Sequence, residues 1–145
     1  MPSLETLYLD RNQFVGEIGE FKYNSLKYLY LGYNKLHGSI PRSVSRLVNL
    51  TQLSLPSNNL SIMLGYEMFS KLENLQYLDF SNNLVSINNN VAYALPNLLR
   101  LNLSSSNISE LPIFLRLTKN LQEGKSIRYP RYITIIQRDR KKNLN

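Results

Sequence analysis

Apolar residues recur along the chain at a fixed spacing, in the pattern L-x-x-L-x-L-x-x-N-x-L, where x is any residue. Five copies align, and their apolar positions include Leu7, Leu29, Leu53, Leu78 and Leu101. The polar position falls at Asn12, Asn34, Asn58, Asn83 and Ser106, so that successive copies are 22, 24, 25 and 23 residues apart. A near-constant step over five copies predicts a repeat architecture in which each copy forms one coil of a solenoid.

The spacing within each copy predicts the elements of a coil. The L-x-L core is a short strand whose leucines point inward while the residues around them point outward. Between strands, residues 41–50 and 67–75 place apolar side chains three apart, which predicts short helical or 3₁₀ return segments. The first return, residues 20–25, is shorter and less regular. We therefore expect an α/β solenoid with short parallel strands on the concave face and these returns on the convex face.

The recurring Asn position predicts a structural ladder. A side-chain amide both donates and accepts, so it can satisfy turn backbone groups of its own coil and of the adjacent coil where water is excluded. Asn12, Asn34, Asn58 and Asn83 can do this fully, and the hydroxyl of Ser106 can do it in part.

Several segments between the strands resemble those of leucine-rich repeat proteins of the plant extracellular type. The sequence LHGSIP at 36–41 matches the L-x-G-x-I-P extension of that class, and FVGEI at 14–18 matches it without the proline. The stretches EMFSKLENL at 67–75, SSSNIS at 104–109 and LPIFLR at 111–116 are similar to those of plant receptor-like proteins of the disease-resistance kind. The resemblance covers about residues 3–122 and implies a receptor ectodomain at the plasma membrane, on the extracellular side.

The sequence also departs from that family. Its members begin with a signal peptide and a cysteine-containing cap and end with a second cap and a membrane helix, and we find none of these patterns here. After residue 122 the repeat pattern does not continue. We therefore expect an uncapped array of about five repeats over 1–122, a basic non-repeat tail without order over 123–145, and a chain that corresponds to an ectodomain fragment whose own compartment the sequence does not fix.

The charge of the chain is concentrated in that tail. The formal net charge is +7 with a sequence pI near 9.7, which by itself would suggest nucleic acid or a membrane surface as a partner. Residues 1–123 carry 10 basic and 9 acidic side chains, a net +1, whereas residues 124–145 carry 7 and 1, a net +6. The pI therefore does not indicate a nucleic-acid-binding domain.

Within the tail, tyrosines lie among the basic residues, as in segments that bind single-stranded nucleic acid. A solvated, disordered terminus is the alternative, and we favour it. The stretch YITII at 132–136 has high strand propensity and is a hazard for self-association.

Outward positions on the strands predict the binding surface. They form columns across the sheet: Thr6, Tyr28, Gln52, Tyr77 and Arg100, then Tyr8, Tyr30, Ser54, Asp79 and Asn102, then Asp10, Gly32, Pro56, Ser81 and Ser104. Tyrosines are common anchors of protein recognition, so we expect a peptide or protein ligand to meet Tyr8, Tyr28, Tyr30, Tyr33, Tyr77, Asp79 and Arg100. The resemblance also implies a co-receptor as a partner in the parent family. The alternative is that the tyrosines simply favour strands and pair across them.

The pattern N-x-S/T occurs at Asn49, Asn59, Asn102 and Asn107 and marks possible N-glycosylation sites in a secreted chain. Chance overlap with the repeat text, which is rich in Asn and Ser, is the alternative and is favoured.

No catalytic or cofactor pattern stands out in the sequence. The chain has no cysteine, and its one histidine is His37. Its acidic residues show no paired spacing that would suit acid–base catalysis, and the sequence contains no glycine-rich phosphate-binding loop. We therefore expect no enzyme, no metal, no small-molecule cofactor and no membrane span. The favoured function is non-enzymatic recognition in immune or developmental signalling; the alternatives are a truncated product without activity of its own and a basic-tailed binder of nucleic acid.

Overall fold

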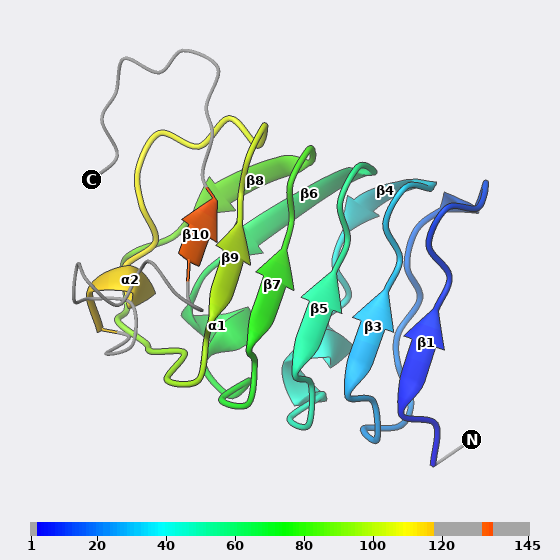
Figure 1. The fold of residues 1–145 in the computed structure, drawn as a ribbon, viewed down its shortest axis with the longest axis horizontal. Coiled ribbons are helices and arrows are strands. Elements are labelled where there is room, and N and C mark those ends of the chain that lie inside the picture. Colours follow the sequence, from blue (N-terminus) through cyan, green and yellow to red (C-terminus); the bar gives the residue numbers. More distant parts are fainter. Residues whose placement is uncertain (1–2, 118–131, 135–145) are drawn as a thin grey trace.

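The computed structural model describes residues 3–117 and 132–134 and forms a solenoid of parallel strands. One strand of each coil enters the main sheet: β1 (Thr6–Tyr8), β3 (Tyr28–Tyr30), β5 (Gln52–Ser54), β7 (Tyr77–Asp79) and β9 (Arg100–Asn102). The strands follow one another in chain order across the sheet (Figure 1). The predicted L-x-L strands and the solenoid are confirmed.

The apolar core lies directly behind the main sheet. The middle leucine of each strand pairs in register with the same leucine of the next coil, from Leu7 to Leu29, Leu53, Leu78 and Leu101. Leu53 and Leu78 are fully buried, whereas Leu7 is only partly buried. At about 1.5 to 3 kcal/mol for each fully buried Leu, the stacking of coils supplies the main stabilisation of the fold.

A second parallel sheet, which the sequence analysis did not predict, follows the Asn turns. It contains β2 (Val15–Gly16), β4 (Lys35–Ser39), β6 (Asn59–Leu64) and β8 (Leu84–Ile87), in that order. In β6, buried Leu60, Ile62 and Leu64 alternate with exposed residues. That period of two is visible in the sequence, although the repeat pattern by itself assigns no element to residues 59–64.

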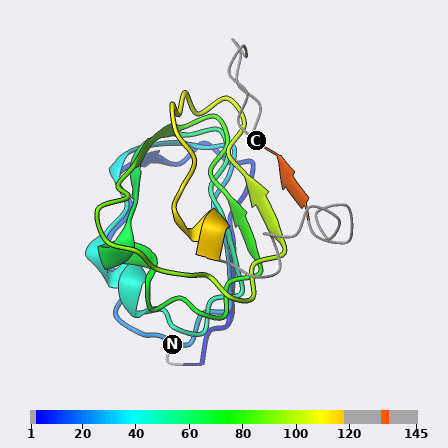
Figure 2. The same cartoon turned by 90° about the vertical axis from the view of Figure 1, so that its left-hand side faces the viewer.

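Short helices complete the coils on the side opposite the main sheet (Figure 2). The 3₁₀ helix η1 (Arg42–Arg46) and the helix α1 (Tyr66–Phe69) fall at the two predicted returns, which are thereby confirmed. Residues 20–25, the shorter and less regular return, form no helix. The helix α2 (Phe114–Leu117) was not predicted; it buries Phe114 against Tyr93 at the C-terminal end of the described array.

The main sheet also has a sixth strand, β10 (Tyr132–Thr134), from the segment predicted to be a tail without order. It pairs in parallel with β9, and Ile133 lies opposite Leu101 in the register of the earlier strands. For 132–134 the prediction is therefore corrected: the strand propensity noted in this stretch is satisfied by pairing with the edge of the array. The rest of 118–145 lies outside the described residues, and the division at residue 122 stays a prediction.

Candidate ligand-binding surface

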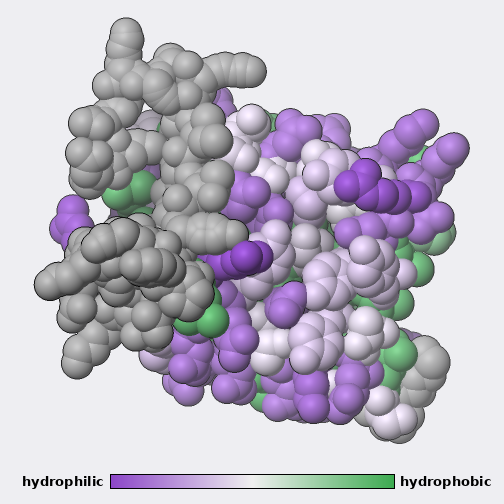
Figure 3. All heavy atoms as spheres, in the orientation of Figure 1, coloured by the Kyte–Doolittle hydropathy of each residue, from purple (hydrophilic) through white to green (hydrophobic). Residues whose placement is uncertain are grey.

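The outward side chains of the main sheet form the predicted columns. The strand register aligns Thr6, Tyr28, Gln52, Tyr77 and Arg100 in one column and Tyr8, Tyr30, Ser54, Asp79 and Asn102 in the next. The placement of these residues on one face is confirmed, whereas their contact with a ligand stays a prediction. Figure 3 looks onto this face, where side chains of intermediate hydropathy gather over the middle and N-terminal strands.

Tyr8, Tyr28 and Tyr30 make up a tyrosine cluster on the N-terminal half of this face. The rings of Tyr8 and Tyr30 lie 5.0 Å apart between centroids and are tilted by 38°. Tyr8 is 66% exposed, and the hydroxyl of Tyr30 donates to Oε1 of Gln52. Burial, together with the neighbouring tyrosines, raises the pKa of Tyr30 above its ordinary value. The predicted ladder packing of tyrosines is therefore present, and it leaves ring surface open to solvent.

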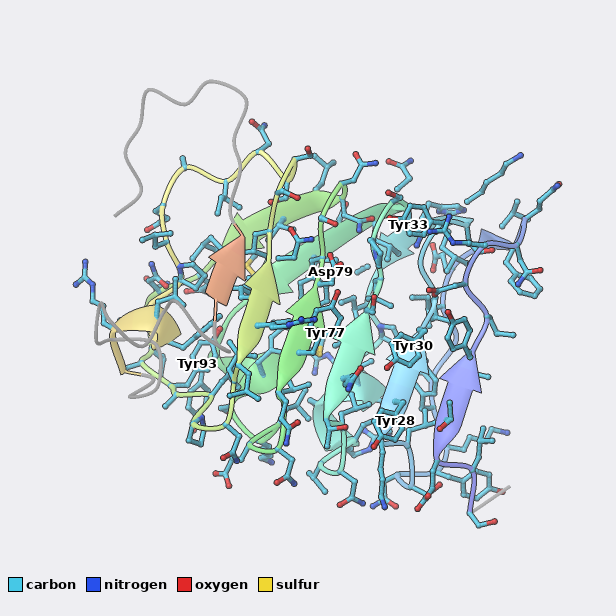
Figure 4. All side chains as sticks on the ribbon, in the orientation of Figure 1. Tyr28, Tyr30, Tyr33, Tyr77, Asp79 and Tyr93 are labelled. Carbon is cyan, nitrogen blue, oxygen red and sulfur yellow. The ribbon has the colours of Figure 1, made fainter. Side chains whose placement is uncertain are left out.

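Tyr33 lies at the turn after β3, above the strand tyrosines (Figure 4). Its φ of 56° is left-handed, and the residue just before the Asn position is left-handed in the other coils too, at Arg11, Ser57, Asn82 and Ser105. The N–H of Tyr33 donates to the carbonyl of Pro56 in the next coil, which fixes this unfavourable backbone conformation. The guanidinium carbon of Arg11 lies 4.2 Å from the centre of the Tyr33 ring, a cation–π contact at the rim of the face.

Asp79 holds its neighbours in place on the C-terminal half of the face. Its carboxylate accepts from the Tyr77 hydroxyl at 3.0 Å and from the backbone N–H and hydroxyl of Ser81 at 2.9 and 2.7 Å. The residue is only 7% exposed. Because most of its acceptor capacity is already used, this geometry suits Asp79 to positioning Tyr77. The predicted contact of Asp79 itself with a ligand stays a prediction.

Tyr77 and Arg100 are neighbours in the same column. The guanidinium carbon of Arg100 lies 5.9 Å from the centre of the Tyr77 ring. This contact keeps a cation beside an aromatic ring on adjacent strands, so the two residues form one composite feature of the surface.

The asparagine ladder behind the turns has the predicted bonds. The Nδ2 of Asn83 donates to Leu55 of the preceding coil at 2.8 Å and to Phe80 and Ser81 of its own coil. Its Oδ1 accepts from the N–H of Leu60 in the preceding coil at 3.0 Å. Asn58 repeats the same four contacts one coil earlier, and Asn34 repeats them two coils earlier. Each amide thus joins two coils.

The two ends of the ladder differ from its middle. Asn12 is exposed, and within the described residues its side chain bonds to carbonyls of its own coil, those of Leu9 and Asp10. Ser106 is fully buried and donates to the carbonyl of Leu103, again within its own coil. Ser106 thus makes one of the bonds that asparagine makes in the middle coils, and among the bonds that the structure describes its side chain makes none to the preceding coil.

A second asparagine ladder, which the sequence analysis missed, runs along the other end of the strands. Asn49 donates to the carbonyl of Asn24 at 3.2 Å, Asn74 to Val48 at 3.0 Å and Asn97 to Glu73 at 2.8 Å. The signal was present in the sequence, because each of these asparagines directly precedes the first leucine of a repeat copy. This ladder links successive coils at the N-terminal ends of the strands, as the first ladder links them at the C-terminal ends.

The four N-x-S/T sites differ in their surroundings. Asn59 and Asn107 are exposed, whereas Asn49 belongs to the second ladder. Asn102 lies on β9, where its Oδ1 accepts from the N–H and the hydroxyl of Ser104. Glycosylation at any of them stays a prediction.

Other candidate chemistry is sparse in the described residues. His37 is exposed on β4, and residues 3–117 and 132–134 hold no cluster of His, Cys, Asp or Glu suited to a metal ion. In the same residues no helix has the length and apolar character needed to cross a membrane. The basic side chains of the tail lie outside the described residues.

Comparison with known proteins places this geometry in a family. The family described as Leucine rich repeat matches residues 2–60. Receptor like protein 24 of Arabidopsis thaliana is 40% identical over 59% of this chain, and Receptor-like protein 54 of the same plant is 32% identical over 80% of it. The chain spans only 10% and 14% of those two relatives.

Among solved structures, the leucine-rich repeat ectodomain of the receptor kinase SOBIR1 from Arabidopsis thaliana has a similar fold. Its TM-score is 0.68 at 22% sequence identity, over 90% of this chain and 68% of that one. The repeat pattern, the strand register and these relatives all indicate the same leucine-rich repeat fold. The chain belongs to the leucine-rich repeat family and corresponds to part of a plant receptor-like protein.

Proposed function

We propose that the exposed face of the main sheet binds a peptide or protein ligand through the tyrosine cluster. The observation that carries this proposal is the Tyr8–Tyr30 pair, with rings 5.0 Å apart and Tyr8 66% exposed. A rigid aromatic surface binds with little loss of side-chain entropy, and tyrosine is enriched at the energetic centres of interfaces.

The polar groups around the cluster support the proposal. The hydroxyls of Tyr30 and Tyr77 bond to Gln52 and Asp79, so the rings are held in place before a ligand arrives. Held rings lower the ordering cost of binding. Arg100, beside Tyr77, supplies a positive group for an acidic side chain or a terminal carboxylate of the ligand.

The relatives are named receptor-like proteins, and the solved structure is the ectodomain of a receptor kinase. We propose that this chain serves the same kind of role within a longer receptor on the extracellular side of the plasma membrane, where ligand recognition is passed to a co-receptor in defence or developmental signalling. The mechanism is surface complementarity, without a catalytic step.

A pair of tyrosine variants tests the proposal. Peptides are selected on the wild-type protein from a random display library, and their affinities are then measured for Tyr8→Ala and for the matched control Tyr23→Ala. Tyr23 is 53% exposed and lies away from the main sheet, in the first return. We expect Tyr8→Ala to weaken binding about tenfold or more and Tyr23→Ala to leave it unchanged. Peptides that bind both variants as tightly as the wild type would contradict the proposal, as would a selection that yields no binder.

A further inference from the structure

A groove lies on the other side of the solenoid, between the second sheet and the short helices. It has a volume of about 610 Å³ and is lined by the ends of β4 and β6, by η1 and α1, and by the loop after β8. These elements come from three successive coils, because each coil places its return beside the previous one (Figure 2). The groove is thus a built feature of the array and is separate from the tyrosine cluster.

Apolar side chains stand open along this groove. Met63 is 53% exposed, Tyr66 46% and Val91 52%. Tyr66 is also held from below, since its ring packs edge-on against Tyr93 at 6.4 Å, and Tyr93 packs on Phe114 at 5.5 Å. Tyr93 and Phe114 are buried, so Tyr66 is a rigid anchor on a packed base.

The charge of the groove is set mainly by η1. Arg42 and Arg46 both line it and are exposed, and Glu67 is the acidic residue among the lining side chains. Across the part of the chain that the structure describes, the recorded ion pair is Lys27 with Glu5, elsewhere on the surface. Both guanidinium groups are therefore available to carboxylates of another molecule.

This combination selects the kind of occupant. A second copy bound symmetrically through the same groove would face two positive surfaces with each other, because Arg42 and Arg46 outnumber the single Glu67 of the lining, and like charges in close contact cost several kcal/mol. An extended acidic segment with apolar side chains would meet both the arginines and the surface of Met63, Tyr66 and Val91. We propose that this groove binds an acidic, partly apolar peptide segment of a partner protein, at a site independent of the proposed ligand face.

Defined peptides test this assignment. Three fluorescein-labelled peptides are titrated with the full chain by fluorescence anisotropy: four Glu-Leu-Ser triplets, four Lys-Leu-Ser triplets and four Glu-Ser-Ser triplets. We expect the first to bind at least about tenfold more tightly than the second, because its charge is complementary. The third should bind more weakly than the first, since it lacks the leucines that cover the apolar wall.

Matched variants locate the site. The double variant R42E/R46E should weaken binding of the Glu-Leu-Ser peptide about tenfold or more, whereas K22E/K71E, with the same change in net charge outside the groove lining, should have little effect. Circular dichroism checks that both fold. Tyr8→Ala should leave this peptide bound, which separates the groove from the ligand face. Three results would overturn the proposal: no binding of the acidic peptide, equal losses in both double variants, or self-association in ultracentrifugation that R42E/R46E abolishes.

Discussion

The first and third coils of the solenoid carry the same repeat pattern but are packed differently. In the third coil Leu50, Leu53 and Leu55 are 0–1% exposed, and Asn58 makes four hydrogen bonds, two of them to the coil before. In the first coil the leucines are only partly buried, and Asn12 is exposed with bonds to its own coil alone. Equivalent repeat positions in the two coils therefore contribute different amounts to the free energy of unfolding.

The difference in burial between the two coils comes from the number of adjacent coils. Within residues 3–117, β1 pairs on one side with β3, whereas β5 lies between β3 and β7. A coil of a solenoid buries its apolar face only against adjacent coils, so its stabilisation is a property of the interface. The comparison leads to matched substitutions in the two coils, which should have unequal effects.

The largest difference is expected for leucine. Leu53→Ala removes a fully buried side chain and should lower the free energy of unfolding by about 2 to 5 kcal/mol. Leu7→Ala, at the same repeat position but partly buried, should cost about 1 kcal/mol. Urea unfolding followed by circular dichroism measures both. Equal losses would show that the first coil is as well packed as the third.

The asparagine ladder should show the same ranking. Asn58→Ala leaves backbone groups of two coils without partners and should cost about 1 to 3 kcal/mol. Asn12→Ala, in an exposed turn, should stay within about 0.5 kcal/mol of the wild type. Thermal melting curves of the two variants test this. An unchanged melting curve for a folded Asn58→Ala protein would contradict the role of the ladder.

A glycine pair tests how closely successive coils approach. A Cβ at Gly32 would lie 2.7 Å from the ring of Pro56 in the next coil, so Gly32→Ala should destabilise the fold by about 1 to 3 kcal/mol. Gly19, in the first return, has open space around it, and Gly19→Ala should be neutral or slightly stabilising. Denaturant midpoints of the two variants decide the point; a neutral Gly32→Ala would mean that the coils can move apart without cost.

The smallest effect is expected at the second ladder. Asn74 is exposed, and its side chain donates one bond to the carbonyl of Val48. Asn74→Ala should therefore cost about 0.5 to 1 kcal/mol, less than Asn58→Ala. The same unfolding experiment measures this cost. A loss of stability as large as that of Asn58→Ala would show that the two ladders stabilise the fold equally.

Much of the candidate surface was predictable because strand register follows from the repeat. Aligning Leu29 with Leu53 also aligns Tyr28 with Gln52 and Tyr30 with Ser54, since side chains alternate along a strand. The role of Asp79 was not predictable in this way. Its burial and its bonds to Tyr77 and Ser81 depend on the local path of the chain after the strand, which the spacing of leucines leaves open.

The sequence by itself determined the solenoid, the order of the main strands, the columns on their outer face and the asparagine ladder, because each follows from a pattern that recurs once per coil. Only the tertiary structure decided the pairing of the second sheet, the place of β10 beside β9 and the groove lined by η1 and α1. These depend on how one coil lies against the next. The contacts between coils, rather than the residues of any one coil, fix them.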